Sequence, residues 1–111
     1  MKEDYSNEVK EIIKQYNKDN IEYGKDLNFF IRRLKVNEGE IEGEILKCDN
    51  LSFTEKQIKE GEIRYALFFV YGKRKGRKYI ITFRDSRLRI ITIFPLGKKT
   101  LRKYRKKGLN I

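Results

Sequence analysis

The chain has 111 residues, which is enough for one modest hydrophobic core and too few for two. Hydrophobic residues make up 39% of the sequence and include seven Phe and seven Tyr, so the composition predicts a folded domain and excludes a disordered one. The absence of histidine and the presence of a single cysteine exclude Ser-His-Asp and Cys-His catalytic sites, His-rich or thiolate metal sites, and an intrachain disulfide.

Three features favour a cytoplasmic protein with no membrane segment. No apolar run reaches the roughly 18 residues that a membrane-spanning helix needs. The first ten residues, MKEDYSNEVK, are acidic and polar, unlike a secretory signal. The lone Cys48 fits a reducing compartment, and without a histidine to activate it we expect a structural residue at a helix end.

Charge is distributed unevenly along the chain, whose net charge is +11. Residues 1–63 hold 11 Lys and Arg against 15 Asp and Glu, whereas residues 64–111 hold 16 Lys and Arg against a single Asp. A solvated face usually mixes both signs, so the near-exclusion of acids from the second part predicts a polyanionic partner. The alternative is that this charge serves solubility alone.

The N-terminal part begins with helical periodicity. Apolar residues predict an amphipathic helix over about residues 6–18, which Ser6 or Asn7 could cap. Its apolar stripe comprises Tyr5, Val9, Ile12, Ile13 and Tyr16. A short extended segment is expected at residues 21–23, and Gly24 is expected to end it.

Two further helices are predicted before residue 48. Asp26 can cap a helix through residues 27–36, and Asn37 with Glu40 has the spacing of a capping box that opens a third helix over about residues 38–47. This third helix carries four glutamates, at positions 38, 40, 42 and 44. The simplest interpretation is a solvated face near a helix N-terminus, and the alternative is a pair of catalytic carboxylates.

From residue 51 the hydrophobic period changes from 3.6 to 2, which predicts strands. The expected strands are residues 51–58, 64–71, 78–83 and 88–94. Polar and apolar residues alternate in the first strand, which suits the edge of a sheet. The second strand is almost continuously apolar, which suits a central position. GKRKG is the expected turn after the second strand, and RDSR is the expected turn after the third. Pro95 is expected to end the last strand. The predicted class is therefore α+β, with N-terminal helices packed on one face of a four-stranded antiparallel meander.

Strand alternation assigns the polar residues of these strands to faces. Lys78, Ile80, Thr82 and Arg84 share one face, and Arg64 lies with Ala66, Phe68 and Val70. In the last strand, Arg87, Arg89, Ile91 and Ile93 are expected on one face, with Leu88, Ile90, Thr92 and Phe94 on the other. The basic residues should therefore form a rim at the strand ends around an apolar middle. The basic run at about residues 97–111 is expected to be an arm that binds along phosphates, with one or two helical turns held on the sheet by Leu101, Tyr104 and Leu109. The alternative is a solvated or frayed terminus.

Two stretches of the chain resemble the RelE/ParE-like toxin superfamily over about residues 20–104. IEYGKDLNFFIRRLKVNEGEIEGEIL resembles the opening of a related domain family, and RYALFFVYGKRKGRKYIITFRDSRLRIITIFPLG resembles its closing meander. Lys25 stands where that family often has histidine. The resemblance implies an RNA-directed toxin-type protein, possible association with the ribosome, and an acidic antitoxin as a partner.

RNA cleavage by the 2′-hydroxyl needs a base, a cation on the phosphate and an acid for the leaving oxygen. Without histidine, Lys or Glu could be the base, Arg could hold the phosphate and Tyr could be the acid or stack on a nucleobase. The catalytic candidates are Lys25, Arg64, Arg84, Arg89 and Tyr104. The candidates for nucleic-acid binding are Arg32, Lys73, Arg74, Arg77, Lys78, Arg87, Lys98, Lys99, Arg102, Lys103 and Arg105.

The sequence thus leaves three functions open. The first is a metal-independent endoribonuclease of the RelE/ParE-like type, with no cofactor and no metal. The second is a non-catalytic nucleic-acid-binding module with a basic sheet and tail. The third is an interaction protein whose acidic and basic halves pair between two copies or with an acidic partner. For any single Lys or Arg, the alternative is a charge at a strand end that prevents aggregation.

Overall fold

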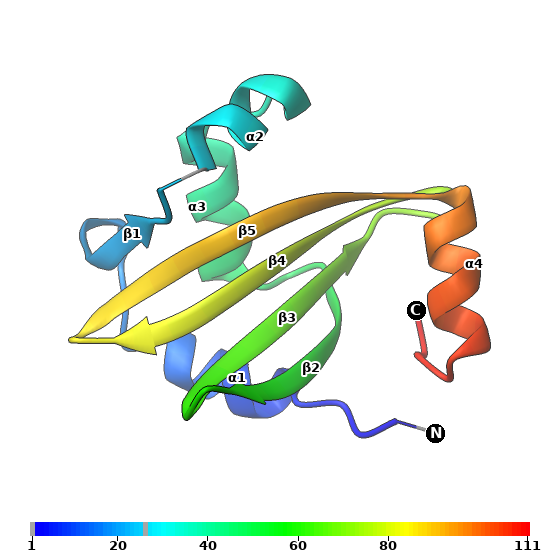
Figure 1. The fold of residues 1–111 in the computed structure, drawn as a ribbon, viewed down its shortest axis with the longest axis horizontal. Helices are drawn as coiled ribbons and strands as arrows, with labels where there is room; N and C mark the ends of the chain where they lie inside the picture. Colours follow the sequence, from blue (N-terminus) through cyan, green and yellow to red (C-terminus); the bar gives the residue numbers. More distant parts are fainter. Residues whose placement is uncertain (1, 26) are drawn as a thin grey trace.

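The computed structural model of the protein describes residues 2–25 and 27–111. The helices are α1 (Ser6–Ile13), the single 3-10 turn η1 (Lys18–Asn20), α2 (Leu27–Leu34), α3 (Glu38–Lys47) and α4 (Lys98–Lys106). The strands are β1 (Ile21–Tyr23), β2 (Leu51–Lys59), β3 (Glu62–Val70), β4 (Lys75–Arg84) and β5 (Arg87–Gly97). The predicted α+β class is confirmed, and Figure 1 shows α4 at the end of the sheet where β5 finishes, far from α2.

The sheet has five strands in the order β1-β5-β4-β3-β2, so the prediction of four antiparallel strands was wrong in its count and pairing. The four long strands do form an antiparallel meander. The fifth strand is the extended piece at residues 21–23, which pairs in parallel with Leu88–Ile90. A three-residue segment is too short to show alternation, and its partner is more than 60 residues away, so the sequence did not indicate this pairing.

The two faces of the sheet carry separate hydrophobic clusters. On the helix face, Tyr65, Leu67 and Ile81 pack with side chains from α1, α2 and α3. On the opposite side, which we call the open face, Phe68 and Leu96 pack with Leu101 and Leu109 of the C-terminal segment. The predicted arrangement of N-terminal helices on one face is confirmed. On the open face, α4 and the residues after it cover part of the sheet.

A β-bulge in β5 overturns the predicted faces of that strand. Ile81 pairs with Ile90, but Ile80 pairs with Thr92, so Ile91 is an extra residue on β5. The bulge shifts the alternation by one residue. Leu88, Ile90 and Ile93 therefore all join the helix-face cluster, and Arg89 and Ile93 do not share a face as expected. Phe94 moves with Thr92 to the open face, where it pairs across the strands with Lys78.

Pro95 does not end β5, contrary to prediction, because the strand continues to Gly97. β1 pairs with β5 only at Leu88–Ile90, and among the described residues no other strand pairs with the outer edge of β5. Proline lacks an N–H donor and is tolerated where no partner strand needs it. The unpaired outer edge thus explains why Pro95 fits within a strand.

The first helix differs from its prediction at both ends. It stops at Ile13 rather than near residue 18, and its N-cap residue is Tyr5 without a side-chain capping bond. Instead, Oδ1 of Asp4 accepts hydrogen bonds from the main-chain N–H of Ser6, at 2.9 Å, and from its hydroxyl, at 2.6 Å. The same oxygen accepts from the N–H of Thr54 at 3.0 Å. A tertiary contact with β2 therefore sets the start of α1.

The third helix forms as predicted over residues 38–47. Oδ1 of Asn37 accepts a 2.7 Å hydrogen bond from the N–H of Glu40, which caps the helix start. Cys48 ends the helix with a left-handed backbone (φ 55°), is buried, and donates its thiol to the carbonyl of Ile45. Its predicted structural role at a helix end is confirmed. The second helix covers residues 27–34 rather than 27–36, and the expected cap at Asp26 lies outside the described residues.

Candidate nucleic-acid interface

The C-terminal helix α4 is a basic element fixed to the sheet by a narrow apolar side. Gly97 ends β5 and serves as N-cap, so the helix starts directly at the end of the last strand. Leu101 is buried in the open-face cluster together with Leu109, as the apolar spacing predicted. All the other long side chains of α4 are Lys or Arg, apart from Tyr104. The helix therefore presents a dense row of cations to solvent.

Two hollows border α4, and every residue that lines them is Lys or Arg. The first, of about 370 Å³, lies between the β3–β4 turn and the helix and is lined by Lys73, Arg74, Lys98, Arg102 and Arg105. The second, of about 360 Å³, is lined by Lys99, Arg102, Lys103, Lys106 and Lys107. Arg102 lines both hollows, so they form one surface, which we call the basic surface. The residues around both hollows carry positive charge, which favours a phosphate group there.

Arg105 holds the first hollow in shape. Its Nε donates a 2.7 Å hydrogen bond to the main-chain oxygen of Ile111, and its Nη1 donates to the main-chain oxygen of Lys73 at 3.2 Å. These bonds join the β3–β4 turn, α4 and the segment after it. Among the described residues, no carboxylate lies within 4 Å of the charged groups of Lys73, Arg74 or Lys98. These cations are therefore available to an external anion.

Lys78 lies under the helix in a cluster of aromatic rings. Its Nζ donates a 2.9 Å hydrogen bond to the hydroxyl of Tyr104. The same ammonium lies 5.3 Å from the ring centroid of Phe68, 5.4 Å from that of Phe94 and 5.2 Å from that of Tyr104. These distances fit cation–π interactions. Lys78 thus links the sheet to α4.

Two candidate arginines share one row of the open face. Arg64 pairs across the strands with Thr82, and Thr82 pairs with Arg89. Since neighbouring strands lie about 4.8 Å apart, the Cα atoms of the two arginines lie about 10 Å from each other. Each already has an acidic neighbour, at 3.6 Å for Arg64 and Glu62 and 2.7 Å for Arg89 and Glu22. A phosphate would have to compete with these carboxylates.

The remaining catalytic candidates lie away from this row. Arg84 is exposed at the β4–β5 turn, with Asp85 3.9 Å away. Lys25 is exposed next to Gly24, whose N–H donates to the carbonyl of Ile90 on β5. Tyr104 lies over Lys78, which is four residues, or about 13 Å, along β4 from Thr82. The five catalytic candidates therefore do not converge on one point.

Four of the expected binding residues line neither hollow of the basic surface, namely Lys78, described above, and Arg87, Arg77 and Arg32. Arg87 is exposed at the β4–β5 turn, where its Nη1 donates to the main-chain oxygen of Asp19 at 2.8 Å. Arg77 is on the helix face, where its Nη1 lies 3.4 Å from Oε1 of Glu44. Arg32 is exposed on α2, an element that packs against β5 rather than α4. Arg87, Arg77 and Arg32 therefore do not contribute their charges to the basic surface.

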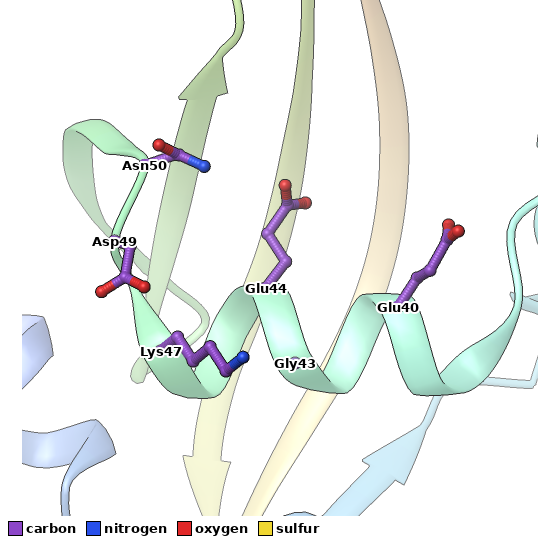
Figure 2. Close-up of a pocket in the computed structure, with 6 residues that line it drawn as sticks. All are labelled: Glu40, Gly43, Glu44, Lys47, Asp49 and Asn50. Atoms are coloured by element: carbon purple, nitrogen blue, oxygen red, sulfur yellow. The ribbon is translucent and has the colours of Figure 1, made fainter.

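An acidic hollow of about 270 Å³ lies on the side of α3 and is shown in Figure 2. Glu40 and Glu44 project from the same side of the helix in this view. Glu44 is not a free carboxylate, because it accepts hydrogen bonds from the hydroxyls of Tyr71 and Tyr79 and pairs with Arg77. Its role is to hold α3 against the sheet. Within residues 2–25 and 27–111, no group of three or more Cys, Asp or Glu side chains is placed to hold a metal ion.

The comparison of the chain with protein families, with curated proteins and with solved structures found no match. Within the described part of the chain, no helix is long and apolar enough to cross a membrane.

Three residues of this region were not among the predicted binding residues. Lys106 and Lys107 line the second hollow, and the basic run in the sequence already indicated them. Phe94 is exposed beside Lys78 on the open face. No local signal could have assigned it there, because the bulge at Ile91 determines the face on which it lies.

Proposed function

We propose that the protein binds nucleic acid, and RNA in particular, through the basic surface formed by α4 and the β3–β4 turn. The observation that carries this proposal is the first hollow, lined by five cations and no other residue. RNA is preferred over DNA because of the resemblance to RelE/ParE-like toxins in the strands and helices of residues 20–104. In support, N-terminal helices pack on one face of a sheet whose four long strands are antiparallel.

Binding to the phosphate backbone follows from the chemistry of these side chains. Arginine offers a planar fork that holds two phosphate oxygens, and lysine adds a point charge. Neutralising phosphates releases the counterions condensed on the nucleic acid, which makes the affinity depend on salt. The segregation of charge between residues 1–63 and 64–111 would orient the protein with its acidic helices away from the polymer.

Binding is favoured over cleavage by the positions of the catalytic candidates. A general base, a phosphate-binding cation and an acid must lie within hydrogen-bond reach of one phosphodiester. Arg64 and Arg89 each have a carboxylate partner, and Tyr104 lies about 13 Å farther along the sheet. Metal-independent RNA cleavage, alone or at the ribosome, stays a prediction, as do pairing with an acidic antitoxin and dimer formation.

The test is fluorescence anisotropy of a labelled 12-nucleotide RNA titrated with the protein over a range of salt concentrations. The variant Arg74→Ala/Arg102→Ala removes two charges from the basic surface. The control Lys18→Ala/Lys47→Ala removes the same charge from exposed sites on η1 and α3. We expect the first variant to lower the slope of log affinity against log salt by about 1.4, and the control to leave it unchanged.

Equal losses in the two double variants would contradict the proposal, because binding would then follow net charge rather than this surface. The same RNA should be incubated with the protein in EDTA, alone and with translating ribosomes. Cleavage by the wild type that is lost in Arg64→Ala would favour the endoribonuclease function over simple binding. A homodimer that dissociates at high salt, in a protein that does not bind RNA, would favour the third function, an interaction protein.

A further inference from the structure

Phe94 is an exposed aromatic ring on the open face, where it pairs across the strands with Lys78. It leaves 42% of its surface accessible, whereas Phe53 and Phe68 in the same cross-strand row are buried. The ammonium group of Lys78 lies over the Phe94 ring, and the exposed part of the ring is accessible to a ligand. The bulge at Ile91 is what places it on this face.

Cations surround this ring and its neighbour Tyr104. Lys78 Nζ lies 5.4 Å from the centroid of Phe94 and 5.2 Å from that of Tyr104. Lys107 Nζ lies 5.9 Å from the Tyr104 centroid and also lines the second hollow of the basic surface. Lys78 therefore contacts both rings, and Tyr104 connects them to Lys107 of the basic surface.

We propose that Phe94 stacks on a nucleobase and that the ligand of the basic surface is therefore single-stranded. This inference rests on the proposed function, since the basic surface must hold the phosphates beside the stacked base. Bases in a duplex are already stacked on each other and cannot lie on a protein ring, whereas an unpaired base can. Stacking accepts any base, so the site would select strandedness rather than sequence.

The position of Phe94 distinguishes it from the other strongly exposed phenylalanine. Phe29 is 65% exposed on α2, but its ring neighbour is Phe30, with centroids 5.9 Å apart. Figure 1 shows α2 far from α4, so Phe29 does not border the basic surface. It provides a control for an exposed aromatic ring away from the basic surface, on a helix that itself carries Arg32 and Arg33.

The experiment uses tryptophan fluorescence, because the chain contains no tryptophan. In Phe94→Trp the single indole should be quenched by a single-stranded 12-nucleotide RNA, since stacking brings a base onto it. A duplex of the same length and inorganic polyphosphate should leave its fluorescence unchanged. Phe29→Trp should respond to none of the three ligands.

Affinity provides the second measurement. Phe94→Leu keeps the apolar contact with the sheet but removes the aromatic face, and it should lower affinity for single-stranded RNA by about 5- to 150-fold. Phe94→Tyr should keep the affinity. Neither substitution should change binding to polyphosphate, which has no bases. Thermal unfolding of each variant verifies that the fold is intact.

Two failures are distinguishable. If wild-type protein binds RNA and polyphosphate, but Phe94→Trp is not quenched and Phe94→Leu binds as wild type, the stacking site is overturned and the proposed function stands. The same conclusion follows if duplex binds as tightly as single-stranded RNA. If wild type binds neither RNA nor polyphosphate, both proposals fail.

Discussion

The ammonium group of Lys78 donates a 2.9 Å hydrogen bond to the hydroxyl of Tyr104, and this contact joins an interior strand of the sheet to the C-terminal helix. Tyr104 also packs edge-on against Phe68, with ring centroids 4.9 Å apart. The tyrosine expected among the catalytic residues is thus part of the attachment of α4. The basic surface depends on this attachment, because α4 supplies most of its cations.

Tyr104→Phe should therefore destabilise the protein by about 1 kcal/mol, the usual contribution of one hydrogen bond. The ring contacts with Phe68 and Lys78 remain, so the loss reports the hydroxyl alone. Urea unfolding measures it. Tyr5→Phe is the control, because its hydroxyl bonds Glu3 at an exposed position and should contribute little. Equal stability of Tyr104→Phe and wild type would contradict this role.

Glu44→Ala should destabilise the protein by about 1–3 kcal/mol. The substitution leaves the hydroxyl of Tyr79, a fully buried residue, without its acceptor at 2.6 Å, and it removes the partner of Arg77. Glu40→Ala is the control one turn away on the same side of α3, where the carboxylate is exposed (Figure 2). Chemical denaturation of both should show a clear difference, and equal losses would argue against the Glu44 cluster.

Stability should fall as the pH rises above about 9. Burial raises the pKa of the Cys48 thiol from 9.0 to about 11. Burial and a hydrogen bond to Glu8 raise the pKa of Tyr65 from 10.0 to about 12, and the pKa values of Tyr23 and Tyr79 are raised for the same kind of reason. The unfolded chain loses these protons first, so it binds fewer protons than the folded chain and stability declines with pH.

Their contribution is complete below pH 9 and is lost as the pH rises through the folded pKa values. Urea unfolding at pH 7, 9 and 10.5 tests this trend. In parallel, absorbance at 295 nm should show part of the tyrosines ionising only when the protein unfolds. Native-state ionisation of all tyrosines near pH 10 would contradict the prediction.

Gly76→Ala should be one of the most damaging small substitutions. A Cβ at this position would lie 2.8 Å from the main-chain oxygen of Phe69 and 3.3 Å from a methyl group of Leu96. Relieving that overlap would require the β3–β4 backbones to separate, with a cost of about 1–3 kcal/mol or more. Gly72→Ala in the same hairpin meets nothing within 4 Å and is the control. Comparable melting temperatures for the two variants would show that the sheet can relax.

The sequence predicted those elements whose signals lie in adjacent residues. The third helix was placed correctly because Asn37 caps it and Cys48 ends it. The faces within β3 and within β4 were correct because alternation is uninterrupted there, so Lys78 was rightly grouped with Thr82, and Arg64 with Phe68. The cluster of cations in the tail was also evident from composition.

The site depended on contacts between distant residues. The pairing of β1 with β5, the bulge at Ile91 and the approach of the β3–β4 turn to α4 each join segments that local patterns cannot connect. The bulge alone moved Phe94 to the open face. The pairing of Arg89 with Glu22 is also a consequence of β1, since it brings the two residues together across the sheet.

By itself, the sequence determined the charge segregation, the third helix and the alternation of β3 and β4, because these follow from the properties and spacing of neighbouring residues. The tertiary structure alone decided which cations surround a common hollow, which arginines have carboxylate partners and which aromatic ring remains exposed. The physical reason is that strand register, a bulge and the docking of a helix are fixed by side-chain contacts far apart in the chain.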